Sequence, residues 1–170
     1  MVESIVEMLH DIHLTPQWIT FFIAALPIVE LRLAIPWALA PTSVFGGGLE
    51  WWQAFIWAIC GNFVPIIPLL VILEPVSNWL RRWSLFDRFF EWLFTRTRKR
   101  GKWIERYEAL GLILFVGIPL PGTGVWTGAV AAFVFGIRFR YALPCVVLGM
   151  LLAAILVTLA SLGVIGIFSI

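Results

Sequence analysis

The chain has 170 residues and a formal net charge of +2, and 61% of its residues are hydrophobic whereas only 13% are charged. A soluble domain carries about 25% charged residues, so this composition excludes a soluble protein and indicates one compact membrane domain. The small net charge, with basic residues beside apolar segments, excludes a nucleic-acid-binding footprint.

The N-terminal stretch 1–14 carries acidic residues and no Lys or Arg, so we expect that it is not a secretory signal peptide. His10 and His13 fit one helix face, but two histidines do not make a metal site, and we expect neither a metal nor another cofactor. Cys60 and Cys145 each lie in an apolar segment, which favours two small buried side chains over a disulfide.

Four apolar segments follow, at about 18–41, 53–74, 110–137 and 141–168. A spanning helix needs about 20 apolar residues, and the second and fourth segments meet this most easily. The first and third contain prolines, glycines or charges, so we predict that each is two half-helices joined by a break. Non-helical backbone at membrane depth occurs only where it is buried in protein or lines a wet cavity.

The first segment holds Glu30 and Arg32 between Pro27 and Pro36. Ionisable residues inside a membrane segment are costly and normally face a cavity or a partner. Positions two apart do not face each other on a continuous helix, but they could do so across a break, which we expect near Glu30–Pro36. We interpret Glu30 as a proton or cation carrier in a substrate site; the alternative is an ion pair that locks the hairpin.

The second segment holds Asn62, followed by Pro65 and Pro68. We expect this buried amide to hydrogen-bond to a hairpin tip.

The connector 76–108 combines an aromatic helix face with a basic patch, "RTRKRGK" at 96–102. The apolar face repeats at steps of four and three through Trp79, Trp83, Phe86, Phe90 and Leu93. This pattern predicts an amphipathic helix in the membrane interface and attraction to anionic headgroups; a plain cytoplasmic connector is the alternative. Nine of the 12 Lys and Arg lie between Arg81 and Arg106, which places this connector in the cytoplasm.

The third segment contains "IPLPGTGVWTG" at 118–128. Pro119 and Pro121 stop a helix, and the glycines allow the chain to turn. A half-helix that begins near Gly124 would offer backbone N–H groups to an anion. We expect the backbone of Gly122, the hydroxyls of Thr123 and Thr127, and the indole N–H of Trp126 to contribute there. The alternative is close packing of small residues between helices.

Arg138 and Arg140 stay on the side of the basic connector if the third segment enters and leaves the membrane at the same face. We therefore predict an all-α integral membrane protein made of two inverted repeats. Each repeat is a broken re-entrant helical hairpin plus a spanning helix, and the amphipathic interfacial helix lies between them. The first repeat is 1–75 and the second is 109–170, within a single membrane domain 1–170. A bundle of four spanning helices is the alternative.

The blocks "ELRLAIPWALA", "CGNFVPIIPLL" and "GLILFVGIPLPGTGVWTGAVAAFVFGIRF" resemble the small multidrug export protein family, over most of the chain from about Glu30 to the end. The family resembles, more distantly, the DedA/VTT membrane proteins, which use two opposed re-entrant hairpins and move lipids, including polyprenyl phosphates. The resemblance implies a functional role for Glu30, Arg32, Pro36, Asn62, Pro65, Pro119, Pro121, Gly122, Thr123, Gly124, Trp126, Thr127 and Gly128. The acidic residue often found beside the Pro-Gly of the DedA motif is Thr123 here.

No HExxH helix, nucleophile elbow or acid–base set occurs in the sequence, so we expect no enzyme and no catalytic residue. We predict a multi-pass transporter of the inner or cytoplasmic membrane that moves an anionic or amphipathic substrate between two hairpin tips and is coupled to protons. Two alternatives stay open: a translocase for polyprenyl-phosphate or phospholipid, and a non-transporting scaffold. The expected partners are membrane lipids, the substrate and protons, and so few helices favour a homodimer.

Overall fold

The computed structural model describes residues 14–42, 46–72, 102–120, 122–135 and 137–168. Their regular structure is helical, with no strand among them, which confirms the predicted all-α class. The predicted interfacial helix at 79–93 lies outside the described residues. The described residues fall into two compact units, one within Met1–Val64 and Leu151–Ile170 and the other within Pro65–Met150.

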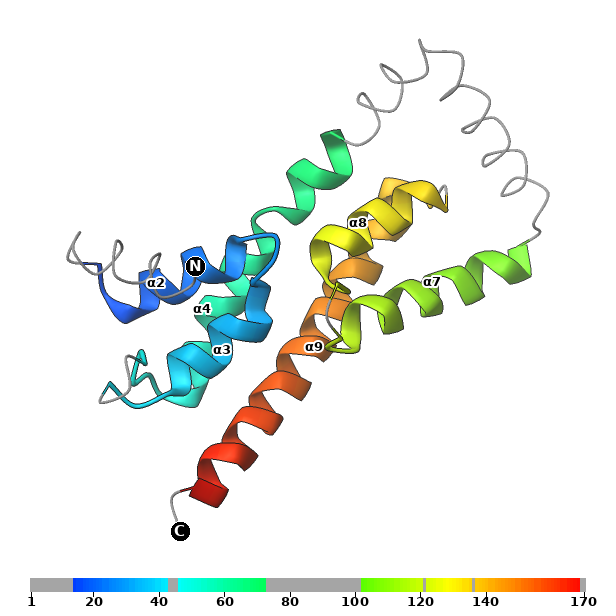
Figure 1. The fold of residues 1–170 in the computed structure, drawn as a ribbon. Coiled ribbons are helices and arrows are strands. Elements are labelled where there is room, and N and C mark those ends of the chain that lie inside the picture. The colour runs from blue at the N-terminus through cyan, green and yellow to red at the C-terminus, as the bar shows by residue number, and fades with distance from the viewer. Residues whose placement is uncertain (1–13, 43–45, 73–101, 121, 136, 169–170) are drawn as a thin grey trace. The chain divides into compact units, whose positions relative to one another are not determined.

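The first unit contains three short helices, α2 (Pro16–Ala25), α3 (Glu30–Leu39) and α4 (Trp51–Phe63) (Figure 1). All three pack against one another. Trp18 contacts Trp57 with ring centroids 5.0 Å apart, and further along both helices Gly61 lies against the backbone of Phe21. Because these contacts advance in the same direction on both helices, α2 and α4 run parallel.

A glycine-rich loop joins α3 to α4 and closes the open end of α3. The last carbonyls of a helix have no partner within it. Here the N–H groups of residues 47–49 donate to the carbonyls of Trp37, Ala38 and Ala40 over 2.8–2.9 Å. Gly48 adopts a φ of 61°, a left-handed conformation that glycine adopts without strain. The loop therefore fixes the end of α3 against the start of α4.

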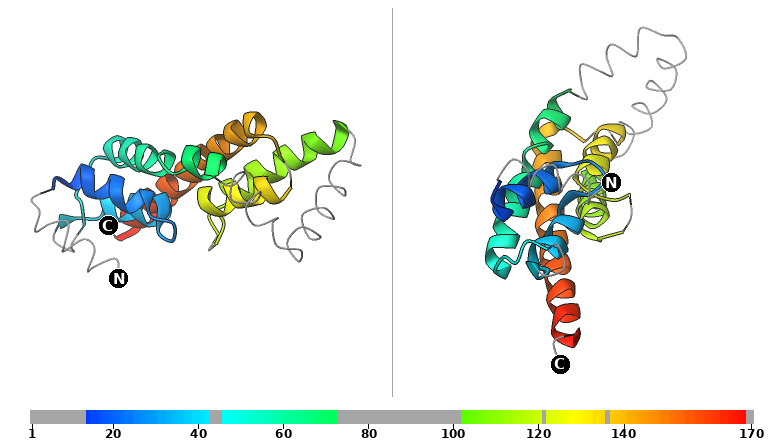
Figure 2. Two further views of the ribbon diagram at one scale, coloured as in Figure 1. Left: turned by 90° about the horizontal axis from the view of Figure 1, so that it is seen from above. Right: turned by 60° about the vertical axis from the view of Figure 1, so that its left-hand side comes forward.

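The second unit contains α7 (Lys102–Gly117), α8 (Val125–Val134) and the first part of α9 (Phe139–Phe168). Figures 1 and 2 show α8 folding back beside α7. Val116 of α7 packs directly over Gly128 of α8 and over Gly149 of α9, where an added Cβ would lie 2.6 Å from the Val116 Cβ. The alternative interpretation of Gly128, close packing between helices, is therefore confirmed.

Two helices are long and apolar enough to cross a membrane, Trp51–Ile72 and Phe139–Val164. They coincide with the second and fourth predicted segments. The helices α2, α3 and α8 have ten residues each, which is about 15 Å of helix. The helix α7 begins at Lys102, inside the predicted connector 76–108, whose bounds stay a prediction. Its first residues are charged, but Lys, Glu and Arg are good helix formers and extend the helix beyond its apolar part.

The surface of the described residues is unusually apolar. Many large hydrophobic side chains are half-exposed or more, in both units, among them Ile28, Leu33, Leu120, Leu148 and Leu159. A soluble monomer rarely exposes apolar patches of this extent. This surface fits the membrane environment that the composition predicts.

Candidate functional site

The first predicted break is present between α2 and α3. The residue before a proline disfavours helix, and Leu26, which precedes Pro27, is extended, with φ −73° and ψ 139°. The Leu26 N–H donates to the Ile23 carbonyl, and the Glu30 N–H donates to the Leu26 carbonyl over 3.0 Å. The turn therefore falls at residues 26–29.

The predicted position of that tip, between Glu30 and Pro36, is wrong, because Pro36 lies inside α3. Pro36 removes one donor from the interior of α3, since it has no N–H for the carbonyl of Arg32. The helix nevertheless continues through it to Leu39.

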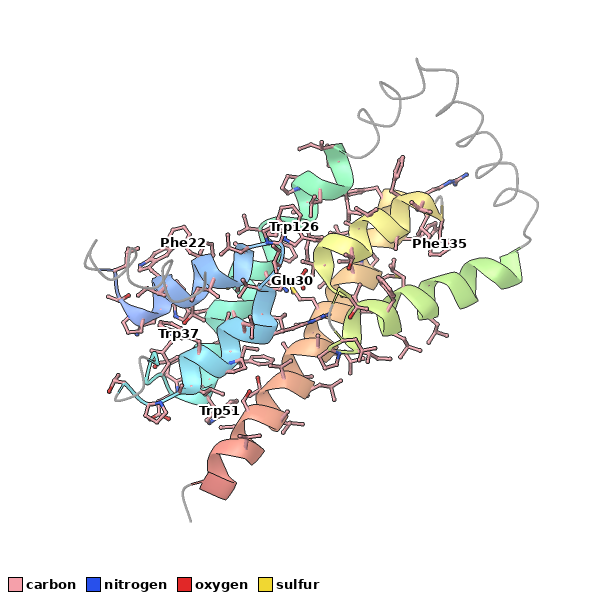
Figure 3. The ribbon with its side chains drawn as sticks, in the orientation of Figure 1. Phe22, Glu30, Trp37, Trp51, Trp126 and Phe135 are labelled. Carbon is pink, nitrogen blue, oxygen red and sulfur yellow. The ribbon has the colours of Figure 1, made fainter. Side chains whose placement is uncertain are left out.

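Glu30 is the first residue of α3 (Figure 3), and its backbone is strained. Its φ is 50°, and among the described residues it is the one non-glycine residue with a positive φ. A non-glycine residue in this region costs about 1–3 kcal/mol, and such residues gather at functional sites. The side chain is only 6% exposed. A buried carboxylate and a strained backbone thus occur at the same residue.

The two charges of the first break interact. Arg32 is half-buried and experiences the electrostatic field of Glu30. On a regular helix, residues two apart point in different directions, but the left-handed backbone of Glu30 interrupts that geometry. The two side chains therefore interact electrostatically, whereas their role in transport stays a prediction.

Asn62 lies on the buried stripe of α4, after Ala54, Ala58 and Gly61. It is 1% exposed, and its Oδ1 has no hydrogen-bond partner among the residues that the structure describes. The predicted hydrogen bond to a hairpin tip is therefore wrong for this oxygen. An unsatisfied buried acceptor costs about 1–3 kcal/mol, so its presence in a native fold needs an explanation.

Glu30 and Asn62 lie at the same end of the first unit. The helices α2 and α4 run parallel and Gly61 lies against Phe21, so Asn62, near the end of α4, lies beside the second half of α2. Glu30 follows α2 directly after the turn. The break, the carboxylate and the amide therefore gather at one end of these three helices.

Two further buried polar residues, Thr20 and Thr158, were missed by the sequence analysis. Each hydroxyl donates to the carbonyl four residues earlier in its own helix, over 2.7 Å to Pro16 and 2.8 Å to Ala154. All the buried polar or charged side chains among the described residues, these two with Glu30 and Asn62, belong to the first unit. A threonine that bonds its own helix has no distinctive pattern in the sequence, so no signal could have found it.

The second predicted break is present between α7 and α8. The helix α7 ends at Gly117, before Pro119, and α8 begins at Val125 after the extended Gly124. The turn is closed by N–H donation from Thr123 to the Leu120 carbonyl over 3.2 Å, and Gly122 adopts a φ of 80°. The predicted helix start near Gly124 is confirmed, whereas the re-entrant hairpin stays a prediction; Pro121 lies outside the described residues.

The threonines of the second break bond to its own backbone. The Thr123 hydroxyl lies 2.9 Å from each of the carbonyl oxygens of Ile118 and Leu120, and the Thr127 hydroxyl lies 3.4 Å from that of Gly124. A Thr123→Val change would thus remove a turn bond of about 1 kcal/mol, and it could not test anion binding alone. Trp126 is half-buried in the first turn of α8. Anion binding at this helix start stays a prediction.

The predicted site residues form two sets. Glu30, Arg32, Pro36 and Asn62 belong to the first unit, and Pro119, Gly122, Thr123, Gly124, Trp126 and Thr127 belong to the second.

Comparison with known proteins supports the family that the motifs indicate. The family model described as "Putative small multi-drug export protein" matches residues 30–156, a range that begins at Glu30 and includes Asn62 and the whole second break. The comparisons with curated proteins and with solved structures found no match. The more distant resemblance to the DedA/VTT proteins stays a prediction. Because the matched range covers well over half of the chain, the chain belongs to this family of small multi-drug export proteins.

Proposed function

We propose that the chain is a proton-coupled exporter of amphipathic small molecules in the cytoplasmic membrane, and that Glu30 carries the proton. The observation that carries this proposal is Glu30 itself, which is buried and strained at a helix break within an apolar segment. The description of the family supports export.

The charge balance at Glu30 suits a carrier that alternates between two states. Placing an ionised carboxylate in apolar surroundings costs several kcal/mol, and Arg32 offsets part of that cost. Binding of a proton removes the charge of Glu30 and leaves that of Arg32. The two protonation states therefore differ in their electrostatic free energy, which is what a coupled transporter needs in order to link proton binding to a change of conformation.

The helix lengths support a re-entrant arrangement of α2 and α3. Each helix is about 15 Å long, half of the ~30 Å hydrocarbon core, and the break lies where α2 ends. Trp51 and Trp52 are half-exposed at the start of α4, and such tryptophans are typical of the membrane interface. The ten residues from Trp52 to Asn62 rise about 15 Å, which would bring Asn62 and the neighbouring Glu30 to about the midplane.

Cysteine labelling tests the re-entrant arrangement. In a protein without Cys60 and Cys145, single cysteines would replace Thr15 and Thr42, two exposed residues that flank α2 and α3. We expect a membrane-impermeant maleimide to label both from the same side of oriented vesicles. Labelling from opposite sides would mean that 16–39 spans the membrane, and the inverted repeat would then be rejected.

Substrate-driven proton movement tests the transport proposal. Proteoliposomes that enclose a pH-sensitive dye would be diluted into solutions of amphipathic dyes and drugs, and we expect at least one compound to change the internal pH faster than in empty liposomes. The same vesicles would receive a fluorescent phospholipid and an external reducing agent. Lipid movement without proton movement would support a lipid translocase, and neither signal would support a scaffold; both results would reject the proton-coupled exporter.

A further inference from the structure

The end of the first unit that holds Glu30 and Asn62 is rich in hydrogen-bond acceptors. Asn62 offers a buried Oδ1 without a partner among the described residues, and Glu30 adds a buried carboxylate that already interacts with Arg32. Thr20 lies earlier on α2, and its buried hydroxyl donates its hydrogen to the Pro16 carbonyl. It therefore provides no hydrogen-bond donor for the Asn62 oxygen. A buried acceptor of this kind is explained by a bound water, an ion or a ligand.

The end of α2 adds further oxygens. The last four carbonyls of a helix lack helical partners, and here only that of Ile23 accepts a turn bond, from the Leu26 N–H. The carbonyls of Ala24 and Ala25 accept none of the turn bonds formed by the described residues. The C-terminal end of a helix also carries roughly half a negative charge, which favours a cation.

Oxygen ligands from a carboxylate, an amide and backbone carbonyls are those that hard cations prefer. Half-helix C-termini and unwound carbonyls coordinate Na⁺ in transporters with broken helices. The described residues contain no group of three or more His, Cys, Asp or Glu able to hold a metal ion, which is the set that transition metals prefer. Arg32 already balances Glu30, and the partial charge of the α2 end suits a single positive charge better than two.

We propose that the α2–α3 break is a binding site for a monovalent cation, with the Asn62 Oδ1, the Glu30 carboxylate and the last carbonyls of α2 as its ligands. The proposal extends the proposed function, because it adds an ion to the end of the unit that holds Glu30. The cation would satisfy the Asn62 oxygen that the fold otherwise leaves without a partner.

Ion-specific thermal stability tests the cation site, with Na⁺ as the probe and K⁺ for comparison. The purified full chain would be unfolded in detergent in NaCl, KCl and choline chloride of equal ionic strength. We expect a saturable rise of Tm in Na⁺ over choline, because a ligand that binds only the folded state stabilises it. Equal Tm values in all three salts would overturn the proposal.

Variants of Asn62 decide whether the rise comes from this site. Asn62→Leu has a similar size and no acceptor, so its Tm should not respond to Na⁺, whatever its Tm in choline. Asn62→Asp keeps the oxygens and should retain the rise. Glu50→Gln, at an exposed carboxylate, is the matched control and should behave as the unmodified chain does. An undiminished rise in Asn62→Leu would reject the site, and should that variant not fold, Asn62→Ala would replace it under the same criterion.

The outcome is separable from that of the proposed function. A Na⁺-dependent Tm that requires Asn62, without any substrate-driven proton movement, would retain the cation site and reject proton coupling. Substrate-driven proton movement, with Tm values that do not respond to any cation, would retain proton coupling and reject the cation site.

Discussion

Glu30→Gln is expected to reduce substrate-driven proton movement to the level of empty liposomes, while the protein still inserts and folds. Glutamine keeps the size of the side chain and some of its hydrogen bonding, but it cannot take up or release a proton. The strain of the left-handed backbone is unchanged, because it belongs to the φ of 50° and not to the carboxylate. The measurement is the initial rate of internal pH change across a pH series.

Two matched variants distinguish the effect of losing the Glu30 carboxylate from the effect of losing any negative charge. Glu30→Asp keeps a carboxyl group that is one methylene shorter, and it should transport more slowly than the unmodified chain but above background. Glu50→Gln removes a carboxylate that is exposed just before α4, and its rate should be unchanged. If Glu30→Gln folds and transports at the unmodified rate at every pH, Glu30 is not the proton carrier.

The presence of a break in each of the two segments could be predicted because prolines interrupt helices locally, although the first break lies at residues 26–29 and not between Glu30 and Pro36. Pro27 makes Leu26 extended, and Pro119 follows the last residues of α7 closely. Pro36 shows the limit of this reasoning. Both Pro27 and Pro36 could end a helix in the first apolar segment. The sequence alone does not indicate that α3 tolerates Pro36 in its interior.

The conformation of Glu30 and the isolation of Asn62 could not be predicted. A left-handed φ is uncommon for a non-glycine residue, and no local pattern in "PIVELR" requires it. It arises because the chain must reverse direction between two helices that pack together. Likewise, the missing partner of the Asn62 oxygen depends on which side chains surround the end of α4, and this is decided by tertiary packing alone.

Gly61→Ala is expected to destabilise the first unit strongly. A Cβ at Gly61 would overlap the carbonyl oxygen of Phe21 and would lie 2.8 Å and 2.9 Å from its carbonyl carbon and Cα. These are backbone atoms, so α2 would have to move away from α4. Overpacking of this kind costs about 1–3 kcal/mol, which should appear as a lower Tm in detergent.

Gly111→Ala provides the opposite expectation within the same protein. Gly111 is exposed inside α7, and a Cβ there would meet nothing within 4 Å. Alanine is the better helix former by about 1 kcal/mol, so Tm should rise.

Gly61 directly precedes Asn62, so the displacement of α2 in Gly61→Ala should also separate the two groups of the proposed site, Glu30 and Asn62, and lower transport. Gly111→Ala should leave transport unchanged. A Gly61→Ala protein as stable as Gly111→Ala would mean that α2 and α4 do not pack as closely as the structure places them, and the grouping of Glu30 with Asn62 would lose its basis.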